Sequence, residues 1–360
     1  MWIRYGILAV LLAACTQTTA DDVTTTSPGL TTTSDAPATT ASSEPTSTTV
    51  GAPTTTASTL APESLVIEVF PVPAGSRPHD VAPAIDGGVW YTAQGSGDLG
   101  WLDPATGETM HIDLGDGSRP HGVIVDDAGA PWVTDSGLNA IVRVDPNSHE
   151  VGVFPLPPDG AGANLNTASF DGNGRLWFTG QGGVYGSLDP ETGTMEVFDA
   201  PGGQGPYGIT TTPDGLVFYA SLAGSYVGAI GDDGSVDVLS PPSDNQGARR
   251  VWSDSSGAVW VSEWNTGNLS RFQPDSGDWT TWPLPGENAA AYAVFVDDAD
   301  IVWVSDFASN SMLRFDPISE TFTVLELPHE PGEVRQIHGR SGEVWGAESA
   351  ADHLILIRTR

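Results

Sequence analysis

Two histidines occupy nearly identical surroundings in this chain, and both are candidates for chemistry. His79 lies in the stretch RPHDVAPAIDGGVWYT, and His121 lies in RPHGVIVDDAGAPWVT 42 residues later. A neutral imidazole can accept a proton during a reaction, so either histidine could act as a general base. Each also stands 11 residues before a tryptophan, Trp90 or Trp132. This constant spacing favours the alternative that the two triplets are equivalent positions of a structural repeat.

The repeat extends over most of the chain. Each unit has a short apolar run, a turn rich in Asp and Gly, and a second run that carries an aromatic residue. Two further runs follow, joined by turns such as DPATG at Asp103. Runs of about five residues rich in valine, isoleucine and aromatics, separated by such turns, are typical of β-strands. The recurring aromatic, spaced by 41–45 residues, is Trp90, Trp132, Trp177, Phe218, Trp260, Trp303 and Trp345.

Four short antiparallel strands in each unit predict a propeller blade, and seven aromatics predict seven blades. The predicted fold class is therefore all-β: a seven-bladed β-propeller of four-stranded antiparallel blades over residues 65–360. After Trp345 only one further strand, at His353, is left for the last blade. The segment LVIEVFPVP at Leu65 has the pattern of a fourth strand. We expect this N-terminal strand to complete the last blade and close the ring, and the aromatics to pack between blades.

Polar residues gather where the first two strands of each blade meet. The first strand lies nearest the axis, and hairpin pairing brings its start beside the end of the second strand. Both sets of positions should therefore meet at one mouth of the channel, where polar groups form the default binding site. Water in the channel is the alternative reason for their polarity. Four of the second-strand ends are carboxylates: Asp135, Glu263, Asp306 and Glu348. The seven first-strand starts are His79, His121, Asn166, Tyr207, Arg249, Tyr292 and Arg335.

The blade sequences resemble a known family. HGVIVDDAGAPWVTD at His121 and IVRVDP at Ile141 are similar to blades of virginiamycin B lyase, the streptogramin lyase, and the resemblance extends from about Leu65 to Arg360. It implies a seven-bladed propeller that opens cyclic type B streptogramins by elimination at the ester bond, with Mg²⁺ and a histidine base. Elimination needs a base for the acidic proton and an electrophile for the developing oxyanion, which accounts for both components.

The last blade carries the segment that corresponds to the family's catalytic residues, EVRQIHGRSGEVWGAE from Glu333 to Glu348. The resemblance puts Glu333 and Glu348 at two metal-binding glutamates. It puts Arg335 at the base histidine, Tyr292 at a substrate-contacting histidine, and His79 at a tyrosine. Because arginine stays protonated at any working pH, Arg335 cannot act as a general base.

These departures leave two interpretations. In the first, the site is rotated: ring closure brings His79 beside Glu333 and Glu348, and His79 acts as the base. Tyr292 then hydrogen-bonds the substrate, and Arg335 can pair with a carboxylate in place of a metal. In the second, the catalytic set is dismantled and the propeller binds a small molecule or peptide without turning it over. Contacts with the bound molecule are expected from His121, Asn166, Tyr207 and Arg249.

Other functions stay open on the sequence. A metal-dependent lactonase could use Asn166, Glu263 and Asp306, although such propellers usually have six blades. A non-catalytic scaffold could dock envelope proteins through the propeller faces. The dipeptide Arg249-Arg250 could bind an anionic group or neutralise nearby acids.

The N-terminal region and the composition predict where the protein works. Arg4, an apolar run and LAAC ending at Cys15 are typical of a bacterial lipoprotein signal over residues 1–15, with Cys15 lipidated. Residues 16–64, rich in Thr, Ser, Ala and Pro, are expected to form a disordered stalk. The net charge of −33 excludes nucleic acid as a partner and leaves the lipid as the only contact with the membrane. We expect a monomeric extracytoplasmic lipoprotein, at the cell surface or facing the periplasm, with a small molecule or cyclic peptide as its ligand.

Overall fold

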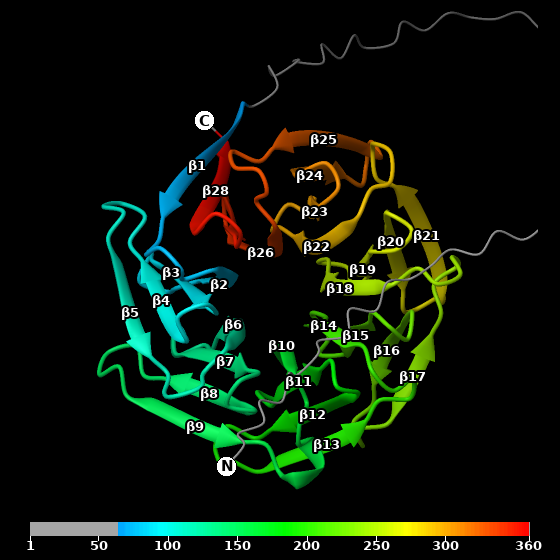
Figure 1. The fold of residues 1–360 in the computed structure, drawn as a ribbon. Coiled ribbons are helices and arrows are strands. Elements are labelled where there is room, and N and C mark those ends of the chain that lie inside the picture. Colours follow the sequence, from blue (N-terminus) through cyan, green and yellow to red (C-terminus); the bar gives the residue numbers. More distant parts are fainter. Residues whose placement is uncertain (1–63, 360) are drawn as a thin grey trace, which may run out of the picture. The chain divides into compact units, whose positions relative to one another are not determined.

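The computed structural model describes residues 64–359, which form seven four-stranded antiparallel sheets arranged in a ring (Figure 1). This confirms the predicted all-β, seven-bladed propeller. Cys15, the predicted signal peptide and the predicted stalk up to residue 63 lie outside the described residues. Among the residues that are described, no helix has both the length and the apolar character needed to cross a bilayer.

The strands follow one another from the axis to the rim in each blade, with one short 3-10 turn, η1 (Pro158–Gly160), between the second and third blades. The first four blades are β2 (Pro78–Pro83), β3 (Val89–Ala93), β4 (Asp98–Leu102) and β5 (Thr109–Asp113); β6 (Pro120–Val125), β7 (Pro131–Asp135), β8 (Ala140–Val144) and β9 (Val151–Pro155); β10 (Leu165–Phe170), β11 (Leu176–Gly180), β12 (Val184–Leu188) and β13 (Met195–Asp199); and β14 (Pro206–Thr211), β15 (Val217–Ser221), β16 (Tyr226–Ile230) and β17 (Val236–Leu239).

The last three blades have the same order. They are β18 (Ala248–Ser253), β19 (Val259–Glu263), β20 (Asn268–Gln273) and β21 (Asp278–Pro283); β22 (Ala291–Val296), β23 (Val302–Asp306), β24 (Ser311–Asp316) and β25 (Thr321–Glu326); and β26 (Val334–Arg340), β27 (Glu343–Glu348), β28 (His353–Thr359) and β1 (Leu65–Pro71).

The N-terminal strand closes the ring, as the sequence predicts. β1 pairs antiparallel with β28 over seven residues, from Leu65 opposite Thr359 to Pro71 opposite His353. Figure 1 shows β1 beside β28 at the rim of the last blade, close to the C-terminus. Both ends of the described chain are therefore held in one sheet, and the last blade gains its fourth strand from the other end of the sequence.

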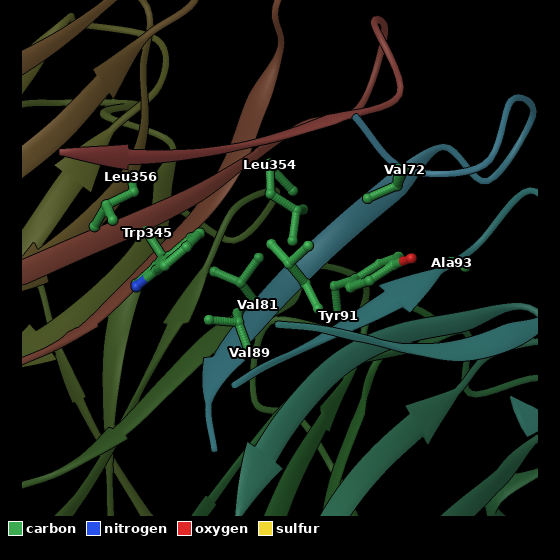
Figure 2. Close-up of a cluster of buried hydrophobic side chains, with 10 residues drawn as sticks. Val72, Val81, Val89, Tyr91, Ala93, Trp345, Leu354 and Leu356 are labelled. Atoms are coloured by element: carbon green, nitrogen blue, oxygen red, sulfur yellow. The ribbon is translucent and has the colours of Figure 1, made fainter. Parts of the chain in front are cut away.

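The repeated aromatics join neighbouring blades. Each is buried in a core cluster with residues of the following blade, and all seven are at most 4% exposed. Figure 2 shows this contact where the ring closes: Trp345 and Leu354 of the last blade pack against Val81, Val89 and Tyr91 of the first. Burying side chains of this size contributes about 1.5–3 kcal/mol each, so these contacts supply much of the energy that holds the ring together.

The turn between the first two strands explains why tryptophan recurs. In the second blade, Asp126 accepts the backbone N–H of Ala130 at 2.8 Å and the indole N–H of Trp132 at 2.9 Å, and Gly129 takes the positive φ of 86°. The same aspartate-to-indole hydrogen bond recurs in the blades of Trp177, Trp260 and Trp303. A hydrogen bond thus joins the turn residue to the packing residue in these four blades.

Candidate functional site

A bulge in every blade sets the positions that face the channel mouth. The first pair of the inner hairpin aligns the start of the inner strand with the end of the second strand, as between Pro78 and Ala93, and the register then shifts before the next pair. The shift recurs in all seven described blades. A bulge bends its strand and redirects the side chains within it. The residue that directly follows the first aligned residue of each inner strand is one of the seven first-strand starts predicted from the sequence, called ring positions from here on. They are His79, His121, Asn166, Tyr207, Arg249, Tyr292 and Arg335.

Hydroxyl groups fix these bulges to the next blade. Thr134 accepts the N–H of Gly122 at 2.9 Å and donates to the carbonyl of Asn166 in the following blade at 2.6 Å. A bridge of this kind also forms at Thr92, Thr179, Ser262 and Ser305, each two residues after the blade's aromatic. The bulged backbone, which has left the strand ladder, is therefore satisfied by a side chain that also joins two blades.

The ring residues surround a cavity of about 490 Å³ at the mouth of the channel. Six of the seven predicted positions line it directly, and Asn166 lies behind His121. None of its lining residues, all within the described propeller, is an aspartate or glutamate. The lining consists of His79, Gln94, Arg119, His121, Ser136, Gly137, Asn164, Gln181, Tyr207, Arg249, Tyr292 and Arg335.

His79 is held by a buried carboxylate. Its Nδ1 lies 2.7 Å from Oδ1 of Asp80, and both residues are at most 5% exposed. Asp80 also receives Nη2 of Arg250 at 3.0 Å, an ion pair that spans the channel from the fifth blade to the first. Because the Asp80 carboxylate accepts a hydrogen bond from Nδ1–H, Nε2 of the neutral His79 ring is left as an acceptor. Burial, together with the positive charges of Arg250, Arg335 and Arg249, lowers the pKa of His79 well below its usual value, which keeps the imidazole neutral.

His121 lies against His79, with ring centroids 3.9 Å apart. The side-chain amide of Asn166 donates to Nε2 of His121 at 3.3 Å, while the Asn166 carbonyl oxygen accepts the hydroxyl of Thr167. Nδ1 of His121 therefore carries the ring proton, and it has no hydrogen-bond partner although it is buried. Burial and the neighbouring His79 lower the pKa of His121 well below its usual value.

Across the cavity, two tyrosines are joined to arginines. The hydroxyls of Tyr207 and Tyr292 lie 2.5 Å apart, and the Arg249 guanidinium stacks on the Tyr292 ring at 3.5 Å. Nη1 of Arg335 reaches the Tyr292 hydroxyl at 3.4 Å. Trp264 also contacts Arg249, with 4.5 Å between the guanidinium and the ring centroid, and its ring is nearly perpendicular to that of Tyr292. The cationic and aromatic side chains thus form one continuous wall.

The pKa values of the two tyrosines are shifted in opposite directions. Burial raises the pKa of Tyr207 to about 12. Burial alone would also raise the pKa of Tyr292, but the guanidiniums of Arg249, Arg250 and Arg335 together lower it below its usual value. Tyr292 is therefore the more acidic partner of their shared hydrogen bond.

The two glutamates expected to hold a metal are engaged elsewhere. Glu333 forms an ion pair with Nη2 of Arg335. Glu348 is fully buried and lies 2.6 Å from Nδ1 of His329. Magnesium requires oxygen ligands directed at one point, with room for its water molecules. Here a guanidinium occupies one carboxylate and an imidazole the other, so the donor set does not fit a magnesium ion. His79 hydrogen-bonds to neither glutamate: its Nδ1 is bonded to Asp80, and its ring packs against that of His121.

The other second-strand carboxylates also turn away from the mouth, contrary to the expectation that they would converge there. Asp135 accepts the N–H groups of Arg119, Gly137 and Leu138. Glu263 accepts three hydrogen bonds from its own blade, and Asp306 accepts N–H groups of its adjoining loops. They stabilise loops, because a buried carboxylate must have its oxygens satisfied. The set of Asn166, Glu263 and Asp306 considered for a lactonase is therefore not assembled at the cavity.

Sequence reasoning named Arg250 as a residue that could neutralise nearby acids, but it missed Asp80 and the pairing of the two. Each follows a ring residue directly, in the second position of the bulge. The dipeptide Arg249-Arg250 was the available signal: Arg250 neutralises an acid, Asp80, whereas Arg249 has no carboxylate partner among residues 64–359. Opposite roles for adjacent arginines follow from the bulge and could not be read from the order of residues alone.

Comparison with known proteins agrees with this architecture. Residues 115–359 match the model of the virginiamycin B lyase family. The chain belongs to this family. A search of curated proteins gave no match. Among solved structures, a streptogramin B lyase is 22% identical with a TM-score of 0.76, covering 82% of this chain and 98% of that one. Virginiamycin B lyase from Staphylococcus aureus is 17% identical with a TM-score of 0.77, covering 82% and 100%.

A third structure with the same fold comes from a different kind of protein. The extracellular domain of a hybrid two-component system from B. thetaiotaomicron is 14% identical with a TM-score of 0.64, covering 82% of this chain and 42% of that one. At these identities the solved structures establish the fold alone. The catalytic roles of His79, Tyr292 and Arg335 and the lipidation of Cys15 stay predictions.

Proposed function

We propose that this propeller acts outside the cytoplasm and binds a small molecule or peptide in the cavity at the channel mouth. The observation that carries the proposal is the cavity itself, which is lined by six of the seven bulge positions. Each position supplies a polar or aromatic side chain on a rigid, bridged backbone, the arrangement that preorganised sites require. A lipid anchor at Cys15 would hold the propeller at the membrane, and the extracellular propeller domain of the two-component system supports this location.

A second candidate function, C–O lyase activity, is favoured by the His79–Asp80 contact. The neutral imidazole, with Nε2 free to accept, is suited to taking a proton from the carbon next to an ester-linked position. The electrons of that C–H bond then form a C=C bond, and the neighbouring C–O bond breaks, releasing a carboxylate. The guanidinium of Arg335 or Arg249 can stabilise the developing oxyanion charge, a part that a metal would otherwise take. In this arrangement Asp80 and Arg250 position the base.

Incubation with a type B streptogramin tests both functions. Calorimetric titration measures binding, and chromatography with fragment spectra measures products. Elimination gives an open isomer of unchanged mass, whereas lactone hydrolysis adds one water. We expect binding in either case, and any open isomer to form equally in EDTA. His79→Gln should lower product formation by 10²-fold or more while binding persists, since a positioned base contributes about 10²–10⁴-fold.

The controls separate the alternatives. His149→Asn changes an exposed histidine of an outer turn and should leave both binding and products unaltered. Product formation that survives His79→Gln, or that depends on magnesium, would remove His79 as a metal-independent base. Binding without product supports the binding function alone. Failure to bind the streptogramin, combined with failure to bind any of the probes described below, would overturn the proposed function.

A further inference from the structure

The charge of the cavity is opposite to that of the protein. The chain has a net charge of −33, with 13 arginines and no lysine. Three of these arginines, Arg119, Arg249 and Arg335, line this one cavity, and no carboxylate does. Placing three guanidiniums together costs free energy through mutual repulsion unless something negative lies between them. Glu333 neutralises the charge of Arg335 alone, and Glu333 itself does not line the cavity.

Arg249 is the one of the three with a buried donor that has no partner within residues 64–359. Its Nη2 donates to the Tyr207 hydroxyl at 3.2 Å, and its guanidinium stacks on the ring of Tyr292 and contacts that of Trp264. Its Nε is buried and has no hydrogen-bond partner. The buried Nε of the adjacent Arg250 also has no partner, but its Nη2 pairs with Asp80, whereas Arg249 has no carboxylate partner among residues 64–359. Stacking holds the guanidinium of Arg249 in place but does not fill its donors.

His121 adds a second unfilled donor from another blade. Its side chain lines the cavity and is 93% buried, being 7% exposed. As argued above, Nδ1 carries the ring proton and has no acceptor. A buried polar group without a partner costs about 1–3 kcal/mol, so both donors indicate a missing acceptor.

We infer that the cavity binds its ligand through an anionic oxygen group, a carboxylate or a phosphate, held by Arg249, Arg335 and the imidazole N–H of His121. The inference rests on the proposed binding function and names the chemical class of its ligand. Guanidinium matches the geometry of both oxyanions through paired N–H donors. The rings of Tyr207 and Tyr292 form the adjoining wall, on which an apolar part of the ligand can pack.

Binding of three probes to the full-length protein tests this inference: benzoate, the uncharged isostere benzamide, and inorganic phosphate. Calorimetry or ligand-observed NMR is run at one ionic strength, balanced with sodium chloride, because so acidic a protein responds to salt itself. We expect benzoate, phosphate or both to bind, and benzamide to bind at least tenfold more weakly than benzoate. The ratio of benzoate to phosphate affinity tells which anion the cavity accommodates.

Variants locate the binding. Arg249→Gln and Arg335→Gln should each lower the affinity for the anion by about tenfold or more, which is the loss expected for one charge-assisted hydrogen bond. Arg249→Lys, which keeps the charge, should restore part of the affinity. Arg143→Gln is the matched control: Arg143 also stacks on a tryptophan, Trp132, but lies in an outer strand away from the cavity.

Three results would overturn the inference. The first is anion affinity that is equal in Arg249→Gln and Arg143→Gln when thermal unfolding shows both variants folded. The second is failure of both benzoate and phosphate to bind at matched ionic strength. The third is equal affinity for benzoate and benzamide, which still leaves the cavity as a binding site. The failure of this inference is thus distinguishable from failure of the proposed function.

Discussion

At the scale of single residues, position in the bulge decides what each polar side chain does. The repeat spacing was sufficient to predict the seven ring positions, because the blades are equivalent. It could not predict that the carboxylates at the second-strand ends hydrogen-bond to the adjoining loops, because those bonds depend on N–H groups that the loop conformation supplies. Nor could it predict the pairing of Asp80 with Arg250, 170 residues apart, across the closed ring.

The neutral histidines of the ring give the protein a measurable acid sensitivity. His79 and His121 have pKa values lowered by burial, below the value of about 6.5 that they regain on unfolding. Below pH 6.5 the unfolded chain therefore binds protons that the folded chain excludes, and stability is lost as the pH falls from 7 toward 5. The loss is up to about 1.4 kcal/mol per pH unit for each histidine that stays neutral.

Denaturant unfolding at pH 7 and pH 5 measures this effect. His121→Gln keeps a hydrogen-bonding group beside Asn166 and removes one titrating site. The pH-dependent loss of unfolding free energy should therefore be smaller in His121→Gln than in the unmodified protein. The comparison cancels the general change in acidic repulsion, which both proteins share. An identical loss in both would show that folding does not lower the pKa of His121.

At the scale of the elements, the bulges depend on hydroxyl bridges between blades. Five described blades have threonine or serine two residues after the aromatic, while the fourth and seventh have Ala220 and Ala347 there. The pattern was present in the sequence, but threonine and serine are common in strands for other reasons. Only the register shift shows that the strand leaves a backbone N–H for the hydroxyl to accept.

Removing one bridge should destabilise the ring. Thr134→Val keeps the shape of the side chain but leaves the N–H of Gly122 and the carbonyl of Asn166 unsatisfied. Each buried unsatisfied group costs about 1–3 kcal/mol, so we expect a loss of about 2–4 kcal/mol in unfolding free energy. Thr323→Val, on the exposed face of β25, is the control and should change stability by less than about 0.5 kcal/mol. Equal effects at the two sites would show that the bridge contributes nothing specific.

At the scale of the whole molecule, the blade count and the ring closure were predictable because both follow from counting strands. Charge is distributed along the axis in a way that counting could not show. The Asp-rich turns, with Asp126, Asp171, Asp254 and Asp297, lie at the opposite end from the arginine-lined mouth, since inner hairpins place turns and strand starts at opposite ends. Net charge alone therefore does not describe the lining of the cavity, which has arginines and no carboxylate.

Closure by β1 can be tested by truncation. A chain starting at Val72 lacks β1, exposes the edge of β28, and loses the packing of Leu65, Ile67 and Phe70. We expect a loss of at least about 3 kcal/mol in unfolding free energy, from three half-buried apolar side chains. Amide hydrogen exchange in β28 should also become faster. A chain starting at residue 60 keeps β1 and should match the full-length protein. If the two truncated chains are equally stable, the closing strand is dispensable.

The arginine-lined cavity of so acidic a protein has a consequence for the speed of ligand capture. An anion arriving from bulk solution first encounters the repulsive field of the −33 charge, which extends over a Debye length of about 10 Å at 0.1 M salt. Added salt shortens that range, whereas the contacts inside the cavity are screened less. The association rate should therefore increase with ionic strength, the reverse of the trend for sites that attract their ligands from a distance. This protein would load its cavity fastest in salty surroundings.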